Sequence, residues 1–123
     1  MEYIYVGFGG ILGAISRYGL SKWAGQRWGG DFPLATFLIN ISGSFILGLL
    51  FVLFDKAGPG MVYLKSFAAT GFLGAYTTYS TFSYEIIVLV RQGEWATAIK
   101  YFVSSVVFGL FAAYGGMVLA GRI

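Results

Sequence analysis

The chain has 123 residues, of which 58% are hydrophobic and only 11% are charged, whereas soluble domains carry about 25% charged residues. This composition excludes a water-soluble protein and leaves room for one small membrane domain. The net charge of +3 comes without a run of basic residues, which excludes a nucleic-acid partner. The absence of Cys and His excludes disulfides, thiol nucleophiles, Cys/His zinc sites and imidazole chemistry. Because so little acid-base chemistry remains, we expect that the protein is not an enzyme.

Four apolar stretches of the chain are long enough to cross a bilayer, whose core of about 30 Å needs about 20 helical residues. They predict an all-α integral membrane protein with four transmembrane helices. The predicted spans cover about residues 3–20, 34–54, 62–90 and 96–119, so that residues 1–123 form a single membrane domain. The short connections between them leave no room for a soluble domain.

The first span contains small residues at Gly9 and Gly13 and one charged residue, Arg17. Small residues four positions apart let neighbouring helices approach closely, and the same spacing recurs at 44/48, 71/75 and 109/113. A charged residue at membrane depth is a candidate for function. A structural bridge from Arg17 to Glu85 or to backbone carbonyls accounts for the charge equally well.

Polar and small residues form one stripe on the second span and another on the fourth. The members of each stripe are four residues apart, which places them on one face of a helix. Such stripes either hydrogen-bond neighbouring helices together or line a path for a polar solute. The stripes consist of Thr36, Asn40, Ser44 and Gly48, and of Tyr101, Ser105, Gly109 and Ala113.

The third span has the most unusual composition, because the ten residues from Gly74 to Ser83 hold five Ser or Thr hydroxyls and three aromatic rings. Thr and Gly are poor helix formers, and hydroxyls compete for backbone hydrogen bonds. We therefore predict that the helix is interrupted near residues 74–78, close to the bilayer midplane. The carbonyls freed by such a break can bind a cation, and the freed amides an anion. The alternative is a kinked but continuous helix whose hydroxyls bond back to the preceding turn.

The polar groups within the spans favour an anion as the solute. Amide and hydroxyl donors dominate, Arg17 is embedded in the first span, and Glu85 is the only carboxylate within a span. The edges of aromatic rings such as Tyr79 and Phe82 carry positive partial charge and add contacts for an anion. The residues alone thus indicate a narrow anion-selective path without naming the ion.

The cationic residues at the two ends of the predicted bundle nearly balance. Three lie on the side of the chain ends and four on the opposite side, with Arg17 left out as a membrane residue. So small a bias does not set the orientation of the chain in the membrane. We therefore predict dual topology and an antiparallel homodimer. The two groups are Lys56, Lys65 and Arg122, and Lys22, Arg27, Arg91 and Lys100.

Three stretches of the chain carry recognisable motifs: residues 10–18, which end in GAISRY, residues 32–43, which run from Phe-Pro to Asn40 and Gly43, and residues 71–85, which contain TTYSTFS. On these motifs the chain resembles the Fluc (CrcB) family of fluoride channels along its whole length. The resemblance implies a multi-pass protein of the bacterial plasma (inner) membrane. It also implies that the protein assembles as an antiparallel homodimer in the lipid bilayer and conducts fluoride passively out of the cell.

The resemblance also implies roles for individual residues. Backbone carbonyls of Gly74 and Thr77 from both subunits would hold a structural sodium ion at the dimer centre, and Arg17 would lie near an aqueous vestibule. The remaining residues would line the fluoride pore with an aromatic box, an amide and hydroxyl groups. They are Tyr79 and Phe82 for the box, Asn40 for the amide, and Thr36, Ser80, Tyr101 and Ser105 for the hydroxyls.

Two pore positions depart from the family pattern. Tyr79 stands where the family usually has Phe, and Gly109 stands where some relatives have a hydroxyl.

Two other classes of protein remain as alternatives. A small dual-topology multidrug/proton antiporter is the main one, but such antiporters build their chamber around a Glu in the first span, where this chain has Arg17. The other alternative is a structural membrane subunit whose polar stripes only hold helices together.

Overall fold

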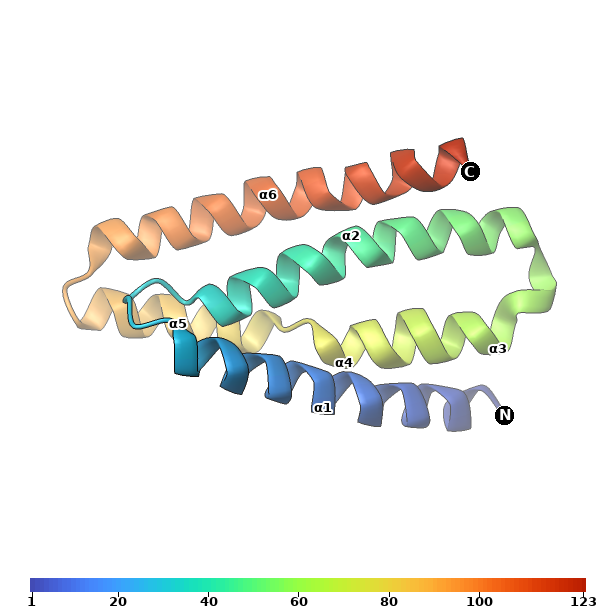
Figure 1. The fold of residues 1–123 in the computed structure, drawn as a ribbon, viewed down its shortest axis with the longest axis horizontal. Coiled ribbons are helices and arrows are strands. Elements are labelled where there is room, and N and C mark those ends of the chain that lie inside the picture. The colour runs from blue at the N-terminus through green and yellow to red at the C-terminus, as the bar shows by residue number, and fades with distance from the viewer.

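The computed structural model describes all 123 residues, and helices make up nearly the whole chain (Figure 1). Three helices run without interruption, namely α1 (Glu2–Arg27), α2 (Leu34–Ala57) and α6 (Trp95–Arg122). Between α2 and α6 the chain follows a third helical path that is built from shorter segments. These are the 3-10 turn η1 (Pro59–Met61), α3 (Val62–Lys65), the π-helix η2 (Ser66–Leu73), α4 (Gly74–Tyr76) and α5 (Tyr79–Arg91).

The helices α2 and α6 are long and apolar enough to cross a membrane, with mean hydropathy of 2.3 and 1.9. Both extend beyond the spans predicted from the sequence, because their last turns continue through Lys56 and Arg122. The membrane crossings of α1 and of the third helical path stay predictions.

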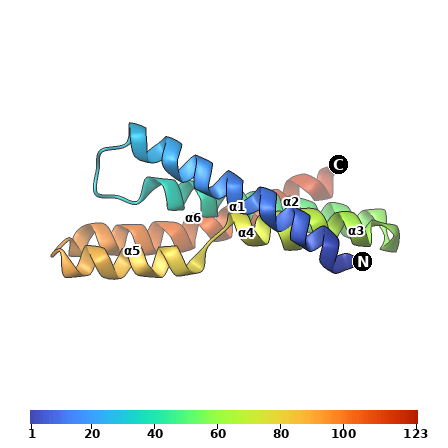
Figure 2. The same cartoon turned by 90° about the horizontal axis from the view of Figure 1, so that it is seen from below.

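The helices associate in pairs. The helix α2 lies alongside α6, and α1 lies along η2 and α4, while α5 packs on α6. Both chain ends lie at the same end of the bundle (Figure 1). Seen from below in Figure 2, α1 crosses the third helical path near α4, and a short non-helical stretch joins α4 to α5.

Glycines bring the backbones of paired helices into direct contact. A Cβ atom at Gly13 of α1 would overlap the carbonyl group of Phe72 in η2, and one at Gly48 of α2 would overlap the carbonyl group of Ala113 in α6. Gly9 meets the carbonyl group of Phe67 in the same way. Packing of this kind holds membrane helices together without a hydrophobic driving force. The predicted role of small residues is therefore confirmed at Gly9, Gly13 and Gly48.

Replacing Gly13 by Ala should lower the free energy of unfolding by about 1–3 kcal/mol, because the added methyl group pushes α1 away from η2. The matched control is Gly19→Ala on the same helix, where a Cβ atom would meet nothing within 4 Å. This control should stabilise the protein by up to about 1 kcal/mol, since Ala is the better helix former. Thermal unfolding in detergent measures both changes, and equal melting temperatures for the two variants would contradict the close contact.

Most side chains of the chain face outward. Only 19 of the 123 residues are buried, and the exposed side chains include large apolar ones such as Leu110, Phe111 and Tyr114 on α6. Such a surface is unsuited to water but suits lipid or a second protein chain. The fold is therefore that of an all-α membrane protein.

Candidate functional site

The third helical path is interrupted at Thr77 and Thr78, which have extended backbone between the end of α4 and the start of α5. The Thr78 hydroxyl caps α5 by accepting a hydrogen bond from the Thr81 N–H at 3.2 Å, a role for which Ser and Thr are favoured. The Thr77 hydroxyl donates to the Leu73 carbonyl at 2.9 Å. The two hydroxyls thus bond to the ends of two separate helices.

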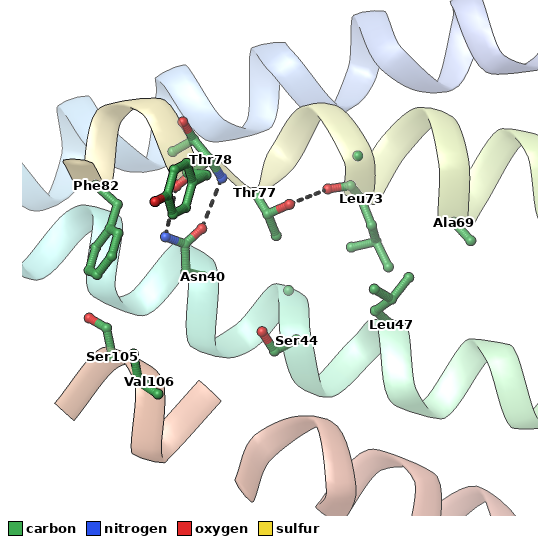
Figure 3. A pocket seen from close by; sticks show the side chains of 13 residues that line it. Asn40, Ser44, Leu47, Ala69, Leu73, Thr77, Thr78, Phe82, Ser105 and Val106 are labelled. Carbon is green, nitrogen blue, oxygen red and sulfur yellow. Dashed lines mark hydrogen bonds between the residues drawn. The ribbon is translucent and has the colours of Figure 1, made fainter. Parts of the chain in front are cut away.

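Asn40 of α2 holds this extended pair in place. Its side-chain Nδ2 donates to the Thr78 carbonyl at 3.0 Å, and its Oδ1 accepts from the Thr78 N–H at 2.9 Å (Figure 3). The two bonds replace the helical partners that the Thr78 backbone lacks. Because a side-chain amide carries two N–H donors, one N–H of Asn40 is left for a further acceptor.

The redirected hydrogen bonds leave two backbone carbonyls without their helical donors. In a continuous helix the Gly74 carbonyl would accept from the Thr78 N–H, which instead donates to Asn40. The Thr77 carbonyl would likewise accept from the Thr81 N–H, which instead donates to the Thr78 hydroxyl. Gly74 and Thr77 are the two residues whose carbonyls the family resemblance selects, and both line the same cavity.

Arg17 bonds to the same region from α1. Its side chain is half-buried, and its Nε donates to the Ala75 carbonyl at 3.0 Å. Glu85, the other partner considered for it, accepts a hydrogen bond from Tyr101 instead. Arg17 therefore makes the bridge to a backbone carbonyl, and its place at a vestibule stays a prediction.

A cavity of about 410 Å³ lies beside the interruption and is lined from α2, the third helical path and α6 (Figure 3). The hydroxyl of Ser105 is buried and has no hydrogen-bond partner, although buried polar groups are normally paired. The Ser105 hydroxyl and the free N–H of Asn40 are therefore hydrogen-bond donors available to a bound ion or small molecule. Six of the ten predicted site residues line the cavity, namely Asn40, Gly74, Thr77, Tyr79, Phe82 and Ser105.

The two residues of the predicted aromatic box are neighbours with different surroundings. The ring centroids of Tyr79 and Phe82 are 6.2 Å apart, with an angle of 49° between the ring planes. Phe82 is only 9% exposed and meets Tyr101 edge to face at 5.0 Å. Tyr79 is 80% exposed, so that most of its ring lies open at the edge of the cavity.

Tyr101 and Thr36 form a second polar cluster on the far side of Phe82. Tyr101 is fully buried and its hydroxyl donates to Glu85 Oε1 at 2.9 Å, and the buried Thr36 lies beside both groups. Neither Thr36 nor Tyr101 lines the cavity. Glu85 was not among the predicted site residues, although its place as the only carboxylate within a span was a signal for it.

Ser80 lies outside the cavity lining as well. Its side chain is exposed, and its Oγ is 3.4 Å from the Oγ1 of Thr78. In its place, Ser44 of the α2 stripe lines the cavity one turn beyond Asn40. The even spacing of the stripe was the sequence signal for Ser44.

A bundle of apolar helices that encloses donors beside an interrupted helix is typical of membrane proteins that bind or conduct a small polar solute. Residues 4–117 match the family model described as "CrcB-like protein, Camphor Resistance (CrcB)". The chain therefore belongs to the CrcB family, and the resemblance inferred from its motifs is confirmed.

Curated relatives match the chain over almost its whole length. The fluoride-specific ion channel FluC 2 of Moorella thermoacetica is 44% identical over 123 residues, which are 100% of this chain and 99% of the relative. The fluoride-specific ion channel FluC of Acidobacterium capsulatum is 42% identical, and the match covers 100% of this chain and 98% of the relative. The fluoride-specific ion channel FluC 1 of Listeria monocytogenes serovar 1/2a is 43% identical over 97% of each chain.

Proposed function

We propose that this protein is a passive fluoride-selective channel of a bacterial membrane, through which fluoride leaves the cell. The observation that carries the proposal is the cavity beside the interrupted helix, where an amide, hydroxyls and an aromatic ring converge. The relatives named above are fluoride-specific ion channels. A channel of this kind is not an enzyme, and neither the relatives nor the first helix, with its embedded Arg17, supports an antiporter.

The chemistry of the cavity suits fluoride for a physical reason. Fluoride is a compact and strongly hydrated anion, so a selective path must replace its water with donors in a narrow space. In our proposal the ion meets the free N–H of Asn40, the ring edge of Phe82 and the hydroxyl of Ser105. Tyr101 and Thr36 then form the next polar group beyond Phe82. Arg17 places a positive charge beside α4 and would attract anions toward the path.

Fluoride efflux from liposomes that contain the purified protein tests this function. We expect rapid efflux of fluoride and, under the same gradient, chloride efflux no faster than from vesicles without protein. A fluoride electrode and a chloride electrode measure the two rates. Equal rates for both halides would contradict fluoride selectivity, and background rates for both would contradict a channel.

We further propose that the channel is an antiparallel homodimer with dual topology in the inner membrane. The ring of Tyr79 is 80% exposed at the edge of a cavity that also contains Asn40 and Ser105. Polar groups that open toward hydrocarbon are unfavourable, whereas a second copy would cover them. Reporters fused to the C-terminus, each active on one side of the membrane only, test the orientation. A signal from one side alone would contradict dual topology.

We also propose that a structural sodium ion binds at the dimer centre. The carbonyls of Gly74 and Thr77 support this, because their helical donors are bonded elsewhere, and unwound carbonyls are the ligands that membrane proteins offer to sodium. A bound ion would add positive charge between the two subunits. Sodium should therefore raise the melting temperature of the purified dimer relative to N-methylglucamine at equal ionic strength, and equal melting temperatures would contradict the site.

A further inference from the structure

A second hollow of the molecule runs along α2 and α6, away from the cavity described above. It consists of two adjoining depressions of about 620 and 460 Å³, which share Phe37 and Phe108. We call them together the α2/α6 groove. None of its residues lines the cavity beside Thr77 and Thr78. The side chains that form most of its wall are Phe32, Phe37, Val103, Val107, Phe108 and Phe111.

The α2/α6 groove has a single charged residue, Lys100, near one end. Lys100, Val103, Val107 and Phe111 follow one another at three- and four-residue spacing, which places them on one face of α6. The Lys100 side chain is exposed, and its ammonium group has no partner within the chain. Since α6 begins at Trp95, and Trp prefers the headgroup level of a bilayer, Lys100 is within reach of lipid phosphates.

The length of the groove matches one leaflet of a bilayer. From Lys100 to Ala112 the helix rises about 18 Å at 1.5 Å per residue. One leaflet contributes about 15 Å of hydrocarbon, which is half of a core about 30 Å thick. An acyl chain that starts beneath Lys100 would therefore follow the groove over its whole length.

We propose that the α2/α6 groove binds an anionic phospholipid, with one acyl chain along the aromatic wall and the phosphate on Lys100. A second copy of the chain is the less favourable occupant. The groove contains no carboxylate, so a symmetric contact between two grooves would bury Lys100 without a partner of opposite charge. The proposal does not depend on which ion the protein conducts.

Photolabelling in vesicles tests the proposal on the full-length protein. The probe is phosphatidylglycerol with a diazirine in one acyl chain, diluted into phosphatidylcholine, and adducts are located by mass spectrometry of peptides. We expect adducts on residues 37–41 and 103–112, at a yield about fivefold above that of a phosphatidylcholine probe with the same chain, because one Lys near the membrane surface adds about that much affinity for an anionic lipid.

Two variants and one control separate the outcomes. Lys100→Gln should reduce the labelling by phosphatidylglycerol about fivefold, whereas Arg91→Gln, an exposed cation of α5 outside the groove, should leave it unchanged. Val107→Phe should lower labelling by both probes, because the larger ring fills the groove. Equal labelling by the two probes would show ordinary lipid contact and overturn the proposal. Absence of adducts from the groove would show that protein covers it and would overturn the proposal as well.

Discussion

Fluoride efflux should fall about 100-fold when Phe82 is replaced by Ile, with the fold of the protein unchanged. Phe82 is 9% exposed and lies between Tyr79 and Tyr101, at the point where the cavity meets the second polar cluster. Ile fills much of the same apolar volume but has no ring edge with positive partial charge. A 100-fold slower passage corresponds to about 2.7 kcal/mol added to the barrier for the ion as it gives up its water.

The measurement is liposome efflux, with size-exclusion elution as the check on folding. The matched control is Phe8→Ile, because Phe8 is exposed on α1 and does not line the cavity. This control should conduct like the original protein. Undiminished fluoride efflux through Phe82→Ile, in protein that elutes normally, would refute the role given to the ring.

Replacement of Asn40 by Ala should both destabilise the protein and stop fluoride efflux. The change removes both bonds to Thr78 and leaves a partly buried N–H and carbonyl unpaired, each at a cost of about 1–3 kcal/mol. We expect the free energy of unfolding to fall by about 2–4 kcal/mol, as measured by thermal unfolding. The same change removes the free N–H that would contact the ion.

Asn40→Asp separates the two contributions. The carboxylate keeps an acceptor for the Thr78 N–H but cannot donate to the Thr78 carbonyl, and it adds a negative charge to the proposed path of an anion. Efflux should therefore be lost while part of the stability is retained. Ser42→Ala serves as the control, because it removes bonds to Ile39 and Tyr76 but none to the interruption. It should lower stability by about 1 kcal/mol and conduct fluoride, and loss of efflux in this control would mean that any damage to α2 stops the channel.

Local composition predicted most of the helical architecture because apolar length and small-residue spacing are local features of the chain. The run from Gly74 to Ser83 indicated a weak helix, and the extended backbone at Thr77 and Thr78 lies within residues 74–78. The π-helix from Ser66 to Leu73 had no counterpart in the sequence pattern. The wider turns of this π-helix lie where Gly9 and Gly13 of α1 contact its backbone. These contacts depend on how the two helices pack against each other.

The partners of the polar residues were harder to predict than the residues themselves. Asn40 was singled out as an amide in an apolar helix, but its bonds go to the backbone of Thr78, 38 positions away. Arg17 bonds to the backbone of Ala75, 58 positions away. Backbone groups look alike at every position of a sequence. Only the tertiary fold decides which of them meets a given side chain.

The interruption at Thr77 and Thr78 also shapes the electric field inside the protein. A helix has a negative carbonyl end and a positive amide end. The path through α3, η2 and α4 finishes with its carbonyl end at Tyr76, and α5 presents its amide end from Tyr79 onward. Two macrodipole ends of opposite sign thus stand almost side by side. The same short stretch of backbone can therefore attract a cation at the carbonyl end of α4 and an anion at the amide end of α5. Neither ion then needs a side chain of opposite charge beside it.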